Sequence, residues 1–133
     1  MFKKFLLSTF FAVQAVCANA QLPGSVCNQT AIYDASTSGN TQIVAATTGT
    51  KIYICGYTLF SAGPSNVGLT TGTGTNCGTG NSKLTPYYEL ASETGISDQG
   101  ATYRGMSTPA SGAVCMYSSA AVAVQGIIYY TQF

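Results

Sequence analysis

Four carboxylate side chains are the main candidates for chemistry in this sequence, because it contains no histidine. Without histidine, the Ser-His-Asp and Cys-His mechanisms and histidine acid–base catalysis are excluded. Glu89 and Glu93 lie four residues apart, whereas Asp34 and Asp98 are distant in sequence. A glycoside hydrolase needs two carboxylates that face each other across a sugar bond, and nothing here singles out such a pair. Because Asp and Glu side chains mostly lie at protein surfaces, we expect solvated carboxylates and no enzymatic activity.

A glycine-rich segment, residues 72–82, is the longest loop that the sequence predicts. Its glycine spacing lacks the third glycine of a dinucleotide-binding loop, and Lys83 is not preceded by the glycine of a phosphate-binding loop. Loops carry binding residues more often than cores do, so its small and polar residues are the candidate binding residues. These residues are Gly72, Thr73, Gly74, Thr75, Asn76, Gly78 and Asn81.

Cysteines are the second group of reactive side chains, and the chain has five. Cys17 lies in an N-terminal segment that we expect to be removed, which leaves Cys27, Cys55, Cys77 and Cys115. An even number of cysteines in an exported chain predicts two disulfides, each worth roughly 2–4 kcal/mol. Three pairings are possible, and the sequence leaves all three open. Because the chain has neither a C-x-x-C motif nor a histidine, we expect no zinc site and no cofactor.

Residues 1–20 have the three parts of a secretory signal peptide. Met1–Lys4 is basic, Phe5–Cys17 is mostly apolar, and Ala18–Ala20 is a small-x-small cleavage site. The apolar run is shorter than the roughly 18 residues that a membrane-spanning helix needs. We therefore expect residues 21–133 to form one secreted, periplasmic or extracellular domain with no membrane span.

The predicted mature chain carries almost no net charge. Lys51, Lys83 and Arg104 are its three basic side chains, and they stand against four acidic ones, which leaves a net charge of −1. Such a surface offers no positive patch to nucleic acid or to an anionic membrane. We therefore expect protein or glycan partners, or self-assembly through the exposed edges of sheets.

The rest of the chain predicts an all-β fold. Turns rich in Gly, Pro, Asn and Ser separate short β-branched and aromatic runs, and no segment shows a helical period. This pattern is typical of a single antiparallel β-sandwich or jelly-roll-like domain, in which residues 92–100 form a polar turn. About eight strands are predicted, at residues 30–35, 41–47, 51–60, 67–71, 84–91, 101–106, 114–118 and 121–130.

The strand predicted at residues 51–60 is the one around which we expect the rest to pack. Alternation places Ile52 and Ile54 on one face and Tyr53, Cys55, Tyr57 and Leu59 on the other. Both faces are apolar or aromatic, which predicts burial on both sides. Residues 121–130 show the same pattern, so we expect these two strands to be neighbours in one sheet.

Two further features bear on binding. The chain has nine tyrosines and no tryptophan. Exposed tyrosines could stack on sugars or serve a protein interface, but core and cross-strand packing is the interpretation that we favour. Asn28-Gln29-Thr30 is an N-glycosylation sequon, which matters only in a eukaryotic secretory pathway.

The run from Tyr33 to Phe133 resembles small all-β proteins encoded in bacteriophage and prophage genomes. The matching features are the segment ending at Ile43–Ala45, the opening Gly49–Ile54 of the long strand, the weak strand at Val67–Leu69, and the ending Ala121–Tyr130. The resemblance covers most of the mature chain and includes no diagnostic catalytic motif. It implies a sandwich-like subunit of a virion, a tail or a decoration layer. The signal peptide and the disulfides depart from that family, because virion proteins normally assemble in a reducing cytoplasm.

Two hypotheses about function follow. The first is a secreted, disulfide-stabilised structural or attachment protein that acts by binding or assembly, associated with a phage particle or a cell surface. Its binding surfaces would be the edge strands and the loop of residues 72–82. The second is a small carbohydrate-binding module or glycan hydrolase, which would need exposed tyrosines on a concave face and, for hydrolysis, a facing pair such as Glu89 and Glu93.

Overall fold

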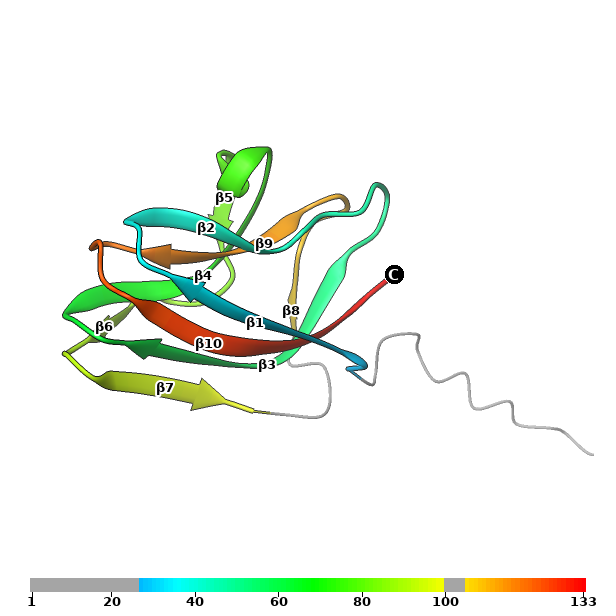
Figure 1. Cartoon of the computed structure of the whole chain (residues 1–133). Coiled ribbons are helices and arrows are strands. Elements are labelled where there is room, and N and C mark those ends of the chain that lie inside the picture. Colours follow the sequence, from blue (N-terminus) through cyan, green and yellow to red (C-terminus); the bar gives the residue numbers. More distant parts are fainter. Residues whose placement is uncertain (1–26, 100–104) are drawn as a thin grey trace, which may run out of the picture.

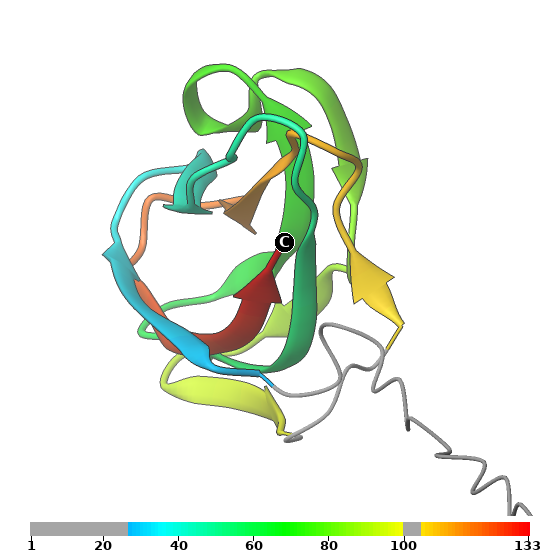
Figure 2. The same cartoon turned by 90° about the vertical axis from the view of Figure 1, so that its right-hand side faces the viewer.

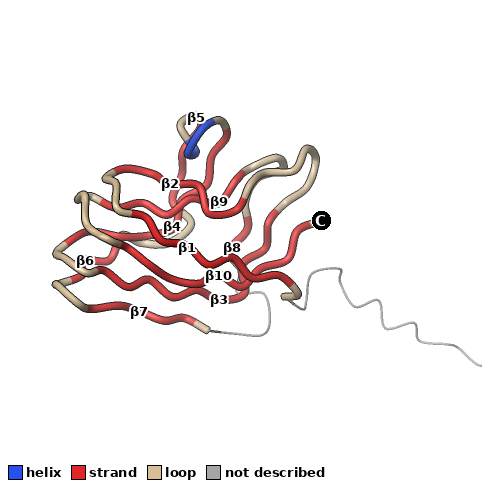
Figure 3. Tube along the Cα trace, in the orientation of Figure 1, coloured by secondary structure: helices blue, strands red, loops and turns tan. Residues whose placement is uncertain are grey.

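The computed structural model describes residues 27–99 and 105–133, and these form two five-stranded antiparallel sheets that pack face to face (Figure 1). The predicted β-sandwich is therefore confirmed, whereas the predicted signal peptide at residues 1–20 lies outside the described residues. Apart from the short 3-10 turn η1, the described part of the chain consists of strands and loops (Figure 3). The elements are β1 (Gln29–Ala35), β2 (Gly39–Val44), β3 (Ile52–Ser61), β4 (Ser65–Thr73), η1 (Thr75–Cys77), β5 (Thr79–Lys83), β6 (Tyr88–Leu90), β7 (Thr94–Asp98), β8 (Met106–Ser107), β9 (Ala113–Ser118) and β10 (Val124–Gln132).

The strand order is that of a jelly roll. The strands pair in a nested pattern from the outer strands inward: β1 with β10, β2 with β9, β3 with β7 and β8, and β4 with β5 and β6. Two further pairings, β10 with β3 and β9 with β4, join these pairs into two sheets. The result is sheet A, in the order β1-β10-β3-β7, and sheet B, in the order β2-β9-β4-β5. The chain passes from sheet A to sheet B between the consecutive strands β1 and β2 (Figure 2).

The predicted neighbours, residues 51–60 and 121–130, do pair as β3 and β10, but the predicted faces of β3 are wrong. The register slips by one residue where Tyr129 lies opposite Gly56 and Tyr130 opposite Ile54. Cys55 is the extra residue of this β-bulge, and it reverses the alternation of side chains. Ile52 and Ile54 therefore face the core together with Tyr57 and Leu59.

The prediction that β3 and β10 are buried on both faces is also wrong at one end of these strands. Phe60 on β3 is 41% exposed, and Gln125 on β10 is exposed beside a half-buried Ile127. Only the inward face is covered there, by the opposite sheet. The core lies between the two sheets and consists of Tyr33, Ala35, Val44, Ile52, Ile54, Tyr57, Leu59, Val67, Leu69, Leu90, Val114, Met116, Val124 and Ile128.

Two strands form in segments that the sequence predicts as loop or turn. β5 forms in the segment predicted as a loop, because it lies along β4, whose backbone offers hydrogen-bonding partners from Thr70 to Thr73. β7 forms in the segment predicted as a polar turn, because it lies along β3 and places Ile96 opposite Leu59. These two strands form because partners distant in sequence supply their hydrogen bonds, which the composition of the segments does not predict.

Other predicted strands are shorter than expected or only partly described. The strand predicted at residues 84–91 is reduced to β6, because Leu84 and Thr85 both donate their backbone N–H groups to Leu69 O and the chain bends there. The strand predicted at residues 101–106 appears only as β8, since residues 100–104 lie outside the described part. The last strand begins at Val124 instead of Ala121.

A close contact of three strands in sheet A centres on Gly126. Tyr33 on β1 lies opposite Gly126, and its hydroxyl donates a hydrogen bond across β10 to Thr58 O on β3, at 2.6 Å. The backbone N–H of Ile127 donates to Thr58 Oγ1 at 2.9 Å. A Cβ at position 126 would overlap both Thr58 O and the Tyr33 hydroxyl, so only glycine fits.

We expect Gly126→Ala to destabilise the domain by about 1–3 kcal/mol or more, because the added methyl group must push Thr58 and Tyr33 apart. The measurement is urea unfolding of the variant and the wild type. Gln125→Ala, one residue away with an exposed side chain, is the control and should change stability by no more than about 0.5 kcal/mol. Equal stability of Gly126→Ala and the wild type would contradict the close packing at this position.

Candidate functional site

The structure resolves the disulfide pairing that the sequence left open. Cys27 pairs with Cys55, and Cys77 pairs with Cys115. The first bridge ties the chain just before β1 to the bulge of β3. The second ties η1 to β9, and it lies with Ala113 in a small buried cluster outside the main core. Two intramolecular disulfides indicate an oxidising, non-cytoplasmic environment for the folded protein.

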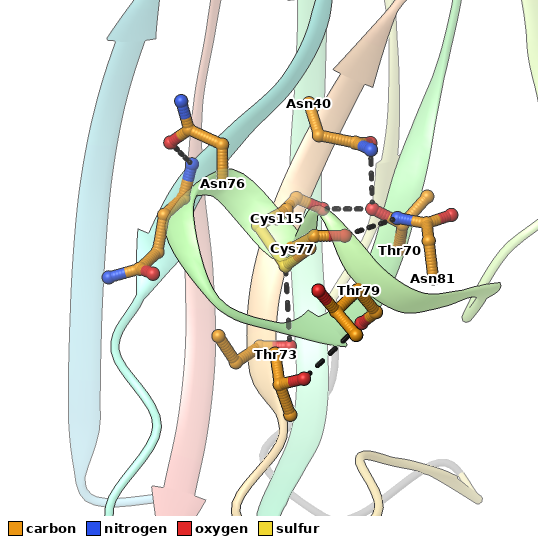
Figure 4. Close-up of a disulfide and its surroundings, with 10 residues drawn as sticks. Asn40, Thr70, Thr73, Asn76, Cys77, Thr79, Asn81 and Cys115 are labelled. Carbon is orange, nitrogen blue, oxygen red and sulfur yellow. Dashed lines mark hydrogen bonds between the residues drawn. A yellow bond between two sulfur atoms is a disulfide. The ribbon is translucent and has the colours of Figure 1, made fainter.

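The glycine-rich segment forms a structured hairpin on the outside of sheet B, pinned by the second bridge (Figure 4). Asn76 and Cys77 adopt left-handed backbone conformations, with φ of 50° and 55°, which makes a tight turn. Asn76 Oδ1 accepts the backbone N–H of Gln42 on β2, and Asn81 Nδ2 donates to Cys77 O. These two side-chain amides hold the hairpin in place. Asn76 and Asn81, which the sequence suggested as binding residues, therefore have a structural role.

The seven predicted binding residues do not form one open surface. Gly72 is buried under the hairpin, where a Cβ would lie 2.8 Å from Cys77 O. Thr73 is exposed, and its hydroxyl donates to Thr79 O across the base of the hairpin. Gly74, Thr75, Asn76, Gly78 and Asn81 are exposed on the hairpin. These five are open to a ligand, but they do not line either of the two depressions described below.

A second surface, which sequence reasoning missed, lies on the outward face of sheet A. We call it the sheet A face and define it by Ile32 on β1, Phe60 on β3 and Gln125 and Ile127 on β10, together with Asp34 on β1. Ile32 is 80% exposed and Phe60 is 41% exposed, and Ile32 lies opposite Ile127 in the ladder. Alternation along β1 could have found Ile32, because Tyr33 and Ala35 are the buried residues of that strand.

The sheet A face contains a shallow depression of about 470 Å³. Its apolar part is formed by the side chains of Ile32, Ile127 and Phe60. On its polar side, Gln125 Nε2 donates a hydrogen bond to Asp34 Oδ2 at 3.0 Å. An apolar surface with a hydrogen-bonding carboxylate and amide beside it can accept either a protein surface or the face and hydroxyls of a sugar.

The floor of this depression is the contact of Tyr33, Thr58 and Gly126. The ring of Tyr33 is 7% exposed, and burial raises the pKa of its phenol far above the usual value near 10. The hydroxyl is therefore neutral at physiological pH and acts as a fixed donor to Thr58 O. Tyr57, on the same strand as Thr58, is also neutral, because burial and then its hydrogen bond to Tyr88 raise its pKa.

The four carboxylates of the sequence lie on three different strands and one turn. Asp34 belongs to the sheet A face, and Asp98 ends β7 opposite Tyr57. Glu89 lies on β6 opposite Asn66 of sheet B, beside a second shallow depression of about 570 Å³ that Ser65, Asn66 and Ser119 also line. Glu93 lies in the turn before β7, with a left-handed φ of 56°. The strands place Asp34 and Glu89 on different sheets.

Most tyrosines in the described residues pack against other side chains, which is the interpretation that we favoured. Tyr33 and Tyr57 are in the core. Outside sheet B, Tyr87 stacks on Tyr117 with ring centroids 4.3 Å apart, and Lys83 Nζ lies 4.0 Å from the centre of the Tyr87 ring. These contacts cover Gly68 of β4, where a Cβ would meet Pro86 O and the Tyr87 ring.

Comparisons of the chain with protein family models, curated proteins and solved structures find no match. In residues 27–99 and 105–133, no group of three or more His, Cys, Asp or Glu side chains could hold a metal ion. No helix in these residues is long and apolar enough to cross a membrane. The function proposed below therefore depends on the geometry of the surfaces.

We expect the two disulfides to be reduced in a fixed order. Cys27 is partly exposed, whereas Cys77 and Cys115 are fully buried, so a mild reductant should open Cys27–Cys55 first. Loss of each bridge should lower the free energy of unfolding by about 3–4 kcal/mol and the melting temperature by about 10 °C or more.

The measurement is alkylation at increasing times in reductant, with mass spectrometry to identify the free thiols and calorimetry to follow the melting temperature. The double variants Cys27→Ala/Cys55→Ala and Cys77→Ala/Cys115→Ala serve as references for each missing bridge. If Cys77–Cys115 were reduced first, the expectation that burial protects this bridge from the reductant would be wrong.

Proposed function

We propose that this chain is a secreted, disulfide-stabilised structural or attachment protein that acts by binding and assembly and not by catalysis. The observation that carries the proposal is the sheet A face next to β1, which ends the order of sheet A. Exposed Ile32 and partly exposed Phe60 and Ile127 lie together beside an edge strand, and such an apolar cluster is typical of a surface that another molecule covers. The secreted, periplasmic or extracellular location extends the oxidising environment that the two disulfides indicate.

Two further points support an assembly role. Jelly rolls occur in viral capsid and lectin domains, where they act by packing or binding, although the fold alone does not decide function. The chain has no histidine, and its described carboxylates are dispersed over two sheets. The resemblance to phage-encoded proteins makes a particle surface one location of such an assembly, and a cell surface is the other.

We expect the mature protein from a producing culture to co-sediment with particles or cell envelopes in a density gradient, detected as peptides of residues 21–133 by mass spectrometry. Ile32→Lys should abolish co-sedimentation without changing the melting temperature by more than a few degrees, because the side chain is exposed. Gln42→Lys, which also introduces a lysine at an exposed position but on the edge strand β2 of sheet B, is the matched control and should co-sediment like the wild type. A wild-type protein found only as free chains in the medium or periplasm would contradict an assembly role.

A second candidate function, carbohydrate binding, is favoured by one specific observation. Phe60 is partly exposed beside the hydrogen-bonded pair of Asp34 and Gln125 in the depression of the sheet A face. Sugar-binding sites combine an aromatic ring that stacks on the apolar side of a sugar with polar side chains that bind its hydroxyls.

For this candidate, we expect Phe60→Ala to weaken binding of an oligosaccharide identified by array screening roughly 2- to 12-fold, through loss of ring contact. The matched control is Phe133→Ala, since Phe133 is 42% exposed but stacks on Tyr53 and is not among the residues that line the depression. Calorimetric titration of both variants is the measurement. Equal affinities of wild type and Phe60→Ala would place sugar binding elsewhere or exclude it.

A further inference from the structure

Among the strands that the structure describes, none pairs with the outer edge of β1, which we call the open edge of sheet A. The hydrogen-bonding direction of β10 shows which backbone groups of β1 face this edge. The N–H of Ile127 points toward β3, where it donates to Thr58 Oγ1. The C=O of Ala123, four residues earlier and therefore on the same side of the strand, also points that way and accepts from the N–H of Ala62, which follows β3. Ile127 therefore does not bond to β1, so its partner Ile32 points its own N–H and C=O away from β10. By alternation, Thr30, Ile32 and Asp34 all direct their backbone groups to the open edge.

The other edges of the sandwich are less suited to pairing with another strand. On sheet B, β2 has a register shift after Gln42, whose N–H is already bound by Asn76, and β5 has a register shift and a left-handed Gly80. On sheet A, β7 has only five residues and ends at Asp98, and β8 has two residues. The strand β6 of sheet B has three residues. In contrast, β1 pairs with β10 over seven residues without a register shift. Bulges, short length and charge are the usual protections of an edge, and among these β1 has only one charge, at Asp34.

We infer that β1 is a self-association edge, at which it pairs antiparallel with β1 of a second copy across a twofold axis at Ile32. This inference rests on the proposed function and names its partner. Ile32 is the central residue of Gln29–Ala35, so a register centred there pairs the full length of both strands. Thr30, Ile32 and Asp34 then form about six backbone hydrogen bonds with the second copy.

The same register is self-complementary in its side chains. On the outward face, Ile32 lies opposite Ile32 of the second copy, and Ile127 flanks it on each side, which makes one continuous apolar row. Asp34 lies opposite Thr30 of the second copy, so the two carboxylates are about 13 Å apart, beyond the Debye length near 10 Å at 0.1 M salt. On the inward face, the small Ala31 lies opposite the large Tyr33.

The contact is limited in size, since a single pair of strands buries less than the roughly 1,200–2,000 Å² of a standard stable interface. We therefore expect a reversible dimer whose population rises as the protein concentration increases from about 1 to 500 µM. On a particle or an envelope, many such contacts act together and strengthen the association by avidity. Ile32→Lys should weaken self-association at least about tenfold, because it places two like charges directly opposite each other.

The test is disulfide trapping in the exported mature protein, read on non-reducing gels after peptide maps confirm both native bridges. Opposite residues in a hydrogen-bonded antiparallel pair have Cα atoms about 5.5 Å apart, within the range of a disulfide. Ile32→Cys should give a covalent dimer. Thr30→Cys alone, on the same strand and face, is the matched control and should stay monomeric, whereas an equal mixture of Thr30→Cys and Asp34→Cys should cross-link.

Analytical ultracentrifugation of wild type, Ile32→Lys and Gln42→Lys over the same concentrations gives a second readout without added thiols. A wild type that is monomeric throughout, or equal trapping of Thr30→Cys and Ile32→Cys, overturns the β1 register. A trapped Ile32 dimer from a chain that co-sediments with nothing in the producing culture supports the register and overturns the proposed function. Co-sedimentation that survives in a monomeric Ile32→Lys protein keeps the proposed function and overturns the role of β1 pairing in it.

Discussion

The pairing of β3 with β10 is the contact on which the rest of this structure depends. It joins the middle of the chain to its end and thereby turns a long hairpin of nested strand pairs into two packed sheets. The bulge at Cys55 adjusts this pairing so that Ile52 and Ile54 share the core with Tyr57 and Leu59. Without that one extra residue, either half of β3 would turn its apolar side chains toward solvent.

Each disulfide reinforces a region that the sheets hold weakly by themselves. Cys27–Cys55 connects the start of the described chain to the bulge, where the ladder of hydrogen bonds is interrupted. Cys77–Cys115 connects the exposed hairpin of η1 and β5 to β9, and Asn76 and Asn81 add hydrogen bonds on the same hairpin. A domain of this size with few charged side chains gains stability in this way without a larger core.

The two sheets differ in what covers their outward faces. The outward face of sheet B carries the η1 hairpin and the stacked rings of Tyr87 and Tyr117, which leave little of its backbone open. The outward face of sheet A has no such cover at Ile32, Phe60 and Ile127, and the hydrogen bond from Tyr33 to Thr58 joins β1 to β3 below it. This asymmetry is the reason why we propose sheet A and its β1 edge as the binding surface.

The sequence by itself determined the β class, the number of disulfides and the central place of residues 51–60, because alternation, turn residues and cysteine counts are local properties. It also predicted that residues 51–60 and 121–130 are neighbours, since both are rich in apolar side chains. Only the tertiary structure decided which cysteines pair, that polar segments become β5 and β7, and that Ile32, Phe60 and Ile127 of three different strands come together on sheet A. Those outcomes depend on partners distant in the chain, whose hydrogen bonds and contacts no local pattern records.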